Sequence, residues 1–286
     1  MEVKEKIFKS IILINTFIAS ITLIFVIFFI LKESIPIFKE VSIVEFITGL
    51  RWNPLGKETE LSILPAILGS LYTSFIAIII SVPLGLGSAI FISFYMREKY
   101  RQGIKAMVQI LMAIPSIIFG FIGLIILVKF FENNFNMAAG ECALAGGVVL
   151  AIMTIPCIIS TITESMDKVC EKYSMASISL GVSKGYMIKK LIIPASKEAI
   201  FSGIILAFSR AIGETMAVML VIGNSPIIPR LFGRAQTIPS LIALEMGSAE
   251  IGSLHYNALF ASGLVLLIIV LFINLIFYYV KYKWKS

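Results

Sequence analysis

Residues 198–222 read EAIFSGIILAFSRAIGETMAVMLVI, an apolar run of membrane-spanning length with two charged residues near its centre. An arginine in the middle of a membrane helix costs about 2.5–3.5 kcal/mol on insertion scales, so Arg210 is expected to face a protein interior or a watery path rather than lipid. Glu214 follows four residues later, which places it on the same face of the predicted helix and within pairing reach. We expect the rest of the chain to surround and move this segment.

The composition of the whole chain indicates an integral membrane protein. Of its 286 residues, 58% are hydrophobic and 14% are charged, and the mean hydropathy is +0.98. Soluble domains are about 45–50% apolar and about 25% charged. The net charge of +7 does not indicate nucleic acid binding, because the basic residues flank apolar runs and no basic module with stacking aromatics is present. Three widely spaced cysteines and a single histidine support neither a disulfide framework nor a metal site.

Six apolar runs are long enough to cross a membrane as helices, so the predicted fold is all-α with six spans. The first run has no small-residue cleavage site at its end and is expected to be retained. Residues 1–66 would form the first span and an extracytoplasmic loop, residues 67–280 a five-helix core, and residues 281–286 a tail. The predicted spans are residues 10–31, 67–95, 106–128, 142–163, 198–222 and 256–280.

The distribution of lysine and arginine predicts the orientation. Basic residues are concentrated in the amino terminus, the second loop, the loop of residues 164–197 and the carboxyl tail. Cytoplasmic loops carry the excess of basic residues in membrane proteins. Both termini and residues 164–197 are therefore expected in the cytoplasm, with the chain as a multi-pass protein of the cell membrane.

Three successive predicted spans each contain a proline, namely Pro83, Pro115 and Pro156. Membrane helices tolerate such residues, so each proline alone has no functional meaning. The alternative interpretation is that the prolines bend helices around a central path, as in transporters with interrupted helices. Their recurrence in three spans favours a transporter.

Residues 164–197 form the most informative loop. Apolar residues recur at helical spacing from Asp167 to Leu180, and Gly181 is suited to end that helix. A second short helix is predicted from Lys184 to Ile192, and Pro194 then marks the entry to the fifth span. The plain alternative is an amphipathic surface helix that anchors the loop beside anionic lipid.

The spacing within this loop resembles the pattern E-A-A, three residues, G, nine residues, I-x-L-P of permease subunits in ATP-driven importers. The resemblance implies that the loop is a coupling helix that sits in a groove of an ATPase subunit. Met175 stands where the family has glutamate, which removes any ion pair from that position. The matching residues are Ala176, Ser177, Gly181, Leu191, Ile193 and Pro194.

Five further segments resemble the PstC-type permease of phosphate importers: FITGLRWNP (46–54), ILPAILGSLYTS (63–74), SVPLGLGSAIFIS (81–93), AIPSIIFGFIGL (113–124) and SRAIGETMAVMLVIGN (209–224). The resemblance implies type I importer architecture, a heterodimer with a PstA-type permease, an ATPase subunit dimer and an extracytoplasmic phosphate-binding protein. No G-x-x-x-x-G-K-[ST] loop occurs in the sequence, so this chain is expected to be non-catalytic, with ATP and Mg²⁺ bound by the ATPase.

Two interpretations of Arg210 and Glu214 stay open. They can form a neutralising pair that fixes the helix, or Arg210 can offer a planar donor fork to an oxyanion in transit. Ser209, Thr215 and Asn224 are candidate donors near the same path, although the two hydroxyls can equally bond to their own helix. His255 has no partner by spacing and is expected at a membrane interface.

Three functional alternatives accompany the phosphate hypothesis. The cargo can be another oxyanion such as molybdate, sulfate or phosphonate. The chain can be an ion-coupled transporter without ATPase partners, which leaves the spacing in residues 164–197 unexplained. It can also have an additional signalling role.

Overall fold

The computed structural model describes residues 2–56, 59–135 and 137–283, which are mostly helical. Within the described residues, one short hairpin interrupts the helices: β1 (Trp52–Asn53) pairs antiparallel with β2 (Glu60–Leu61). The all-α prediction is confirmed. Shorter helices lie beside the long ones: η1 (Pro36–Lys39), α2 (Ile43–Thr48), η2 (Phe91–Tyr95) and α12 (Ile238–Glu245).

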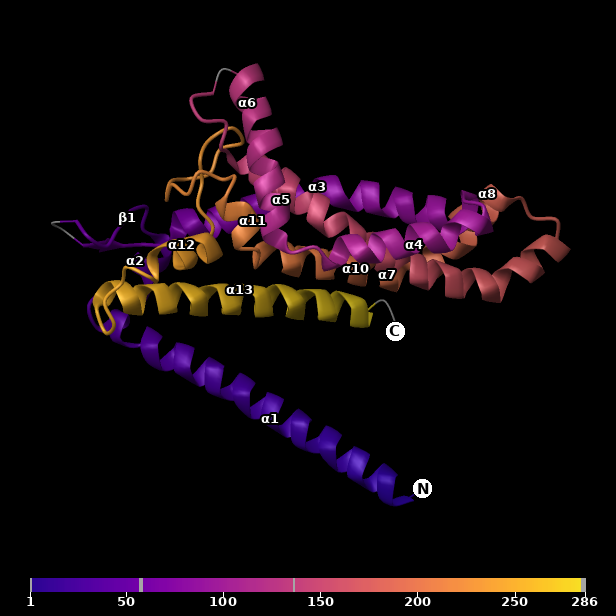
Figure 1. The fold of residues 1–286 in the computed structure, drawn as a ribbon, viewed down its shortest axis with the longest axis horizontal. Coiled ribbons are helices and arrows are strands. Elements are labelled where there is room, and N and C mark those ends of the chain that lie inside the picture. The colour runs from indigo at the N-terminus through magenta and orange to yellow at the C-terminus, as the bar shows by residue number, and fades with distance from the viewer. Residues whose placement is uncertain (1, 57–58, 136, 284–286) are drawn as a thin grey trace.

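Four helices form the bundle: α3 (Leu64–Ile90), α7 (Ala143–Ser179), α10 (Lys197–Ile212) and α13 (Leu254–Lys283). The helices α3 and α7 make the most extensive contact, and α10 packs on α7, α3 and α13 (Figure 1). Small residues let these backbones approach closely. A Cβ on Gly147 of α7 would lie 2.4 Å from the Ile76 side chain, and one on Gly85 of α3 would lie 2.6 Å from Ile158.

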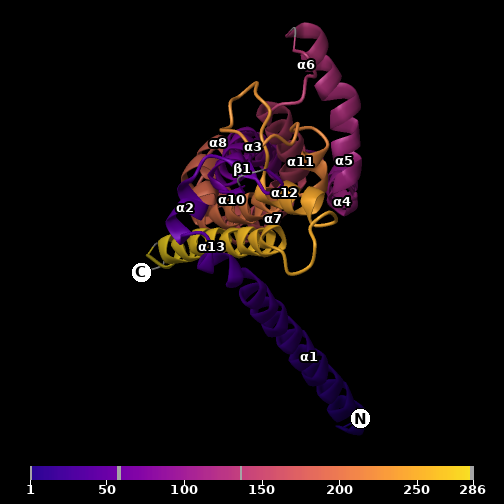
Figure 2. The same cartoon turned by 90° about the vertical axis from the view of Figure 1, so that its left-hand side faces the viewer.

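The first helix, α1 (Glu2–Ser34), meets the bundle only near its end. Phe29 packs edge-on against Phe260 of α13 with ring centroids 5.5 Å apart. The amino-terminal part diverges from the bundle, as both Figure 1 and Figure 2 show. Its apolar side chains, Phe17 at 64% and Ile24 at 66% among them, are exposed.

The predicted third span, residues 106–128, is wrong as a single helix. The structure has α4 (Glu98–Ala113), a break at Ile114 and Pro115, and then α5 (Ser116–Ile122), the π-helix η3 (Gly123–Val128) and α6 (Lys129–Asn134). Pro115 precedes α5 in extended geometry, φ −56° and ψ 136°, so it separates two helices instead of bending one. The apolar stretch of spanning length is Ser116–Asn134, and it projects away from the bundle (Figures 1 and 2).

The helix that contains the predicted fourth span does not stop at residue 163, because α7 continues without a break to Ser179. The helix predicted from Asp167 to Leu180 is therefore the continuation of the span. Pro83 and Pro156 do lie inside long helices, α3 and α7. Beyond Gly181 the chain forms α8 (Lys184–Met187), the π-helix η4 (Ile188–Ile192) and α9 (Ile193–Ala195), which confirms the second short helix of the loop.

Residues 198–222 do not form one continuous helix. Among the described residues, five helices are long and apolar enough to cross a membrane, and six when Lys184–Ala195 and Lys197–Ile212, bent by 64°, count as one span. The helix α10 ends at Ile212, and the four-residue helix α11 (Met216–Met219) follows after a gap. The predicted span of residues 198–222 is therefore interrupted beside its two central charged residues, Arg210 and Glu214.

Candidate functional site at the break between α10 and α11

A helix break separates Arg210 from Glu214, the two central charged residues of the segment 198–222. Arg210 is in the last turn of α10, whereas Glu214 follows the C-cap residue Gly213. The Glu214 carboxylate accepts a hydrogen bond from the Ala217 amide at 3.3 Å and so caps the start of α11. The predicted shared helix face is wrong, because the helix stops between the two residues.

Arg210 is half-buried and has no acidic partner within the described chain, whose ion pairs include neither Arg210 nor Glu214. The carbonyl groups at the end of α10 carry partial negative charge, which stabilises a cation in the last turn. A cation held by a helix terminus and without a carboxylate partner can bind an anion directly.

The hydroxyl groups of Ser209 and Thr215, predicted beside Arg210, both have hydrogen-bond partners within the protein. The Ser209 hydroxyl donates to Oδ1 of Asn274 on α13 at 3.2 Å, so it joins two helices and does not bond to its own. Thr215 is the N-cap residue of α11, and its hydroxyl lies 3.5 Å from the Gly213 carbonyl oxygen. These side chains hold the break in shape.

Asn224 shapes the turn that follows α11. Its backbone has a positive φ of 43°, and its side-chain amide donates to the Met219 carbonyl oxygen at 2.6 Å. Asparagine tolerates this left-handed conformation better than most residues. The amide predicted to serve the path is thus used in the turn, while the buried Oδ1 has no hydrogen-bond partner in the described residues.

The loop after this turn covers the start of α7. The amides of Cys142, Ala143 and Leu144 donate to carbonyl oxygens of Val221, Gly233 and Leu231 at 3.0–3.2 Å. These amides are unpaired within a helix, so the loop satisfies them. The break after Arg210 is therefore anchored to the bundle on its α11 side.

The residues predicted to couple to an ATPase lie at the far end of α7. Gly181 has φ +66° and ends the helix, and the Val182 amide donates to the Ser177 carbonyl oxygen at 3.0 Å in a Schellman arrangement. Met175 and Leu180 beside it are 82% and 79% exposed. The structure places all the predicted loop residues in one helical hairpin: Ala176, Ser177, Gly181, Leu191, Ile193 and Pro194.

Residues 81–284 match the family model described as "Binding-protein-dependent transport system inner membrane component". The chain belongs to this family. Its fold is that of type I ABC importer permeases, and it is a multi-pass membrane protein. The matched residues include both the break beside Arg210 and the hairpin around Gly181.

Two curated relatives cover most of this permease. It is 35% identical over 240 residues to "Probable ABC transporter permease protein YqgH" of Bacillus subtilis. That alignment covers 83% of this chain and 78% of the relative. It is 32% identical over 310 residues to "Probable phosphate transport system permease protein PstC" of Methanocaldococcus jannaschii. That alignment covers 100% of this chain and 98% of the relative.

Two solved structures share the fold. A chain of the inward-facing MetNI methionine ABC transporter superposes with a TM-score of 0.61 at 14% identity, over 77% of this permease and 95% of that chain. A chain of a bacterial ABC transporter involved in the import of the acidic polysaccharide alginate superposes with a TM-score of 0.61 at 16% identity. The superposition covers 97% of this permease and 98% of that chain. At these identities the likeness concerns the fold.

A polar cluster that the sequence did not indicate lies at the α12 end of the permease. Glu245 of α12 accepts hydrogen bonds from Nε1 of Trp52, at 2.9 and 3.0 Å, and lies 2.7 Å from Nε2 of His255. Trp52 and His255 are each 8% exposed. His255, for which sequence spacing indicated no partner, does have one in Glu245. Its partner is ten residues away in sequence and Trp52 is 193 residues from Glu245, so no local spacing pointed to the cluster.

Proposed function

We propose that this chain is the PstC-type permease subunit of an ATP-driven importer that carries inorganic phosphate across the cytoplasmic membrane. The observation that carries the proposal is Arg210, a half-buried cation at a helix break with no acidic partner within the described chain. The sequence SRAIGETMAV around it and the full-length likeness to an archaeal relative named as a phosphate permease support phosphate as the cargo.

The proposed assembly pairs this permease with a PstA-type permease, an ATPase subunit dimer and an extracytoplasmic phosphate-binding protein. ATP and Mg²⁺ would bind on the ATPase, and this chain would perform no covalent chemistry. Both termini and the hairpin around Gly181 would lie on the cytoplasmic side, where basic residues concentrate. The exposed Met175 and Leu180 give that hairpin an apolar tip suited to a protein partner.

The proposed mechanism uses the bend between α9 and α10. Closure of the ATPase pair would displace the hairpin, and α8, η4 and α9 would pass the motion across the 64° bend into α10. Arg210 at the end of α10 would then compensate the charge of a phosphate oxyanion in transit. A low affinity for phosphate at Arg210 is enough for transport, because a permease must also release its cargo.

The test is phosphate uptake by the reconstituted complex with Arg210→Ala. We expect uptake to be lost while the variant still co-purifies with the ATPase and the second permease. Arg230→Ala is the matched control, because Arg230 is exposed on the loop before α12 and should retain uptake. Normal uptake by an assembled Arg210→Ala complex would remove Arg210 from the path.

Two further measurements separate the alternatives. Competition by molybdate, sulfate and phosphonate in the same assay identifies the oxyanion, and preferential inhibition by one of them would replace phosphate as the cargo. Uptake that persists in vesicles without the ATPase would indicate an ion-coupled transporter instead.

A further inference from the structure

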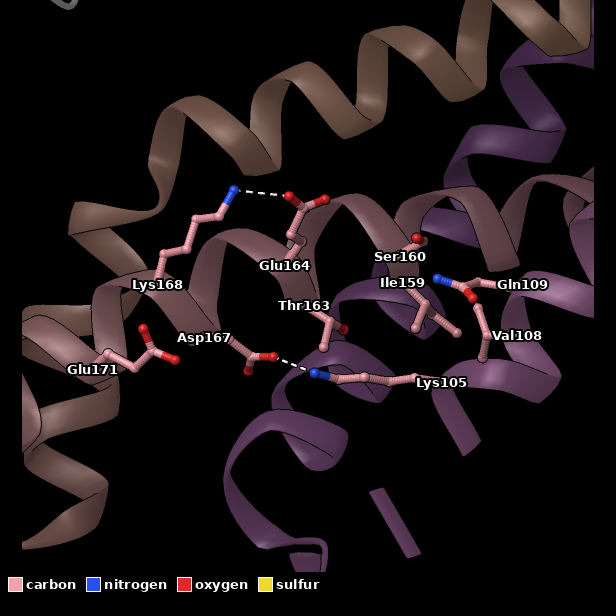
Figure 3. A pocket seen from close by; sticks show the side chains of 10 residues that line it. All are labelled: Lys105, Val108, Gln109, Ile159, Ser160, Thr163, Glu164, Asp167, Lys168 and Glu171. Atoms are coloured by element: carbon pink, nitrogen blue, oxygen red, sulfur yellow. Dashed lines mark hydrogen bonds and ion pairs between the residues drawn. The ribbon is translucent and has the colours of Figure 1, made fainter. Parts of the chain in front are cut away.

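Asp167 forms ion pairs that join α7 to α4, two helices that are distant in sequence. It lies on α7, and its two carboxylate oxygens accept from Arg101 and Lys105 of α4, one cation on each oxygen. Figure 3 shows the Lys105 ammonium directed at the Asp167 carboxylate. The Arg101 and Asp167 side chains are only 19% and 18% exposed. Partial burial strengthens such pairs relative to exposed ones.

Two kinds of contact join α4 to α7, the ion pairs of Asp167 and a small apolar contact. Val108 of α4 and Ile159 of α7 belong to a small buried cluster. Beside it lies a cavity of about 450 Å³, lined from α4 by Lys105 and Gln109 and from α7 by residues that include Thr163. The apolar contact holds one side of this cavity and Asp167 holds the other.

Each helix leads from Asp167 to a part of the proposed transport machinery. In one direction α7 continues to its end at Gly181, the hairpin proposed to contact an ATPase. In the other direction α4 ends at the Ile114–Pro115 break, and α5 follows. A Cβ on Gly120 of α5 would lie 2.7 Å from Cα of Ala217 in α11, so these two helices are in close contact.

We propose that Asp167 holds α4 to α7 as one rigid unit throughout the transport cycle. Displacement of the hairpin then reaches α5 and α11 through α4, in addition to the direct connection through α10. The two connections meet at the break between Arg210 and Glu214 from opposite sides. This inference rests on the proposed function for the ATPase that moves the hairpin, and it requires no particular cargo.

The first test follows α5 directly. In a complex with Cys142, Cys157 and Cys170 replaced by alanine, Ile118→Cys, at a position 44% exposed in the wild-type chain, is labelled with a maleimide with and without ATP. We expect an ATP-dependent change in labelling rate that Asp167→Asn abolishes and Asp167→Glu retains. An unchanged ATP response in the Asp167→Asn complex would overturn the proposal.

Glu164→Gln is the matched control for this test. Glu164 lies three residues before Asp167 on the same helix, but its carboxylate pairs at 2.8 Å with Lys168 of α7 itself. Its loss removes an equal charge without touching α4, so the ATP response at position 118 should persist. Because labelling does not depend on the cargo, a failure of the proposed phosphate transport would appear separately, as absent uptake by the wild-type complex.

The second test asks whether α4 and α7 separate. The double variant Lys105→Cys with Asp167→Cys, in the same cysteine-free background, lacks the two charges and should show reduced ATP-driven uptake. A short, reducible cross-linker between the two thiols should restore uptake, since it replaces the ion pair by a covalent tie. Cross-linking that blocks uptake, with recovery on reduction, would mean that the helices must part and would overturn the proposal.

Discussion

Two glycines of α3 differ in the space that their surroundings leave for a side chain. A Cβ on Gly69 would lie 2.0 Å from the Gln236 carbonyl oxygen, whereas one on Gly87 would meet nothing within 4 Å. The Gln236 backbone immediately precedes α12, whose Ile238 amide also donates to the Ser70 hydroxyl at 2.9 Å. The glycine at position 69 therefore lets the loop before α12 dock on α3.

Substitution of these two glycines should have opposite effects. Gly69→Ala overpacks the contact and should lower the free energy of unfolding by about 1–3 kcal/mol. Gly87→Ala should be neutral or raise it by about 0.5–1 kcal/mol, because alanine favours the helix over glycine. Thermal unfolding of the purified variants in detergent checks both. Equal melting temperatures would show that α3 and the loop do not approach so closely.

At the level of residues, the sequence predicted which polar groups matter better than it predicted their contacts. Arg210 was expected away from lipid because of its insertion cost, and the structure half-buries it at a helix end. Its pairing with Glu214 was derived from an unbroken helix, and Gly213 ends that helix. The hydrogen bond from Ser209 to Asn274 joins residues 65 apart, so helical spacing contains no signal for it.

Among the elements, α7 ends through the conformation of one residue. Gly181 has φ +66°, and an added side chain would meet no atom within 4 Å. Substitution there therefore acts through the backbone, because the left-handed conformation costs other residues about 1–2 kcal/mol.

We expect Gly181→Val to weaken capture of the ATPase and ATP-driven uptake, because valine strains the left-handed turn of the hairpin at this point. Gly185→Val is the control, since Gly185 also has open space around it but lies in the helix α8 with an ordinary φ. Co-purification of the ATPase with each variant is the measurement. Equal capture by the two variants would remove Gly181 from the coupling role.

The end of the fourth-loop helix at Gly181 was predicted correctly because glycine suits a helix end, whereas boundaries placed by polarity were predicted poorly. The end of the fourth span was placed at the first charged residues, but α7 continues through them because its charged turns pair within the helix and with α4. Polarity indicates where a helix leaves the membrane, not where it stops. The division of the third span at Pro115 was missed because apolar residues continue on both sides of it.

On the scale of the whole molecule, the α12 end is held together by side chains from three distant segments. Trp52 belongs to the hairpin, Glu245 ends α12 and His255 begins α13. Their hydrogen bonds close the buried cluster that also contains Phe46, Leu61 and other apolar residues. One carboxylate therefore fixes the arrangement of all three segments.

Glu245→Ala should loosen this end by about 1–3 kcal/mol, because it leaves the buried Trp52 Nε1 group without its acceptor. The measurement is limited proteolysis, and faster cleavage between residues 42 and 62 is expected. Glu250→Ala removes an exposed carboxylate from the neighbouring turn and should leave the cleavage rate unchanged. Equal cleavage rates in the two variants would contradict the role of Glu245.

The family architecture was predictable from sequence because it depends on local patterns: apolar runs, glycine at a helix end and short motifs along the chain. The mutual arrangement of α1, the α5–α6 arm and the bundle was not, since long-range contacts have no local pattern. The three segments that meet at Glu245 are the clearest case.

The length of α7 has a mechanical consequence. At 1.5 Å per residue its 37 residues make a rod of about 55 Å, against a hydrocarbon thickness of about 30 Å. In the proposed orientation, the excess length extends the hairpin end of α7 beyond the hydrocarbon core. A partner that binds the hairpin end of α7 can therefore move the buried part of the helix. A small tilt of α7 is then enough to reposition the helices packed along it.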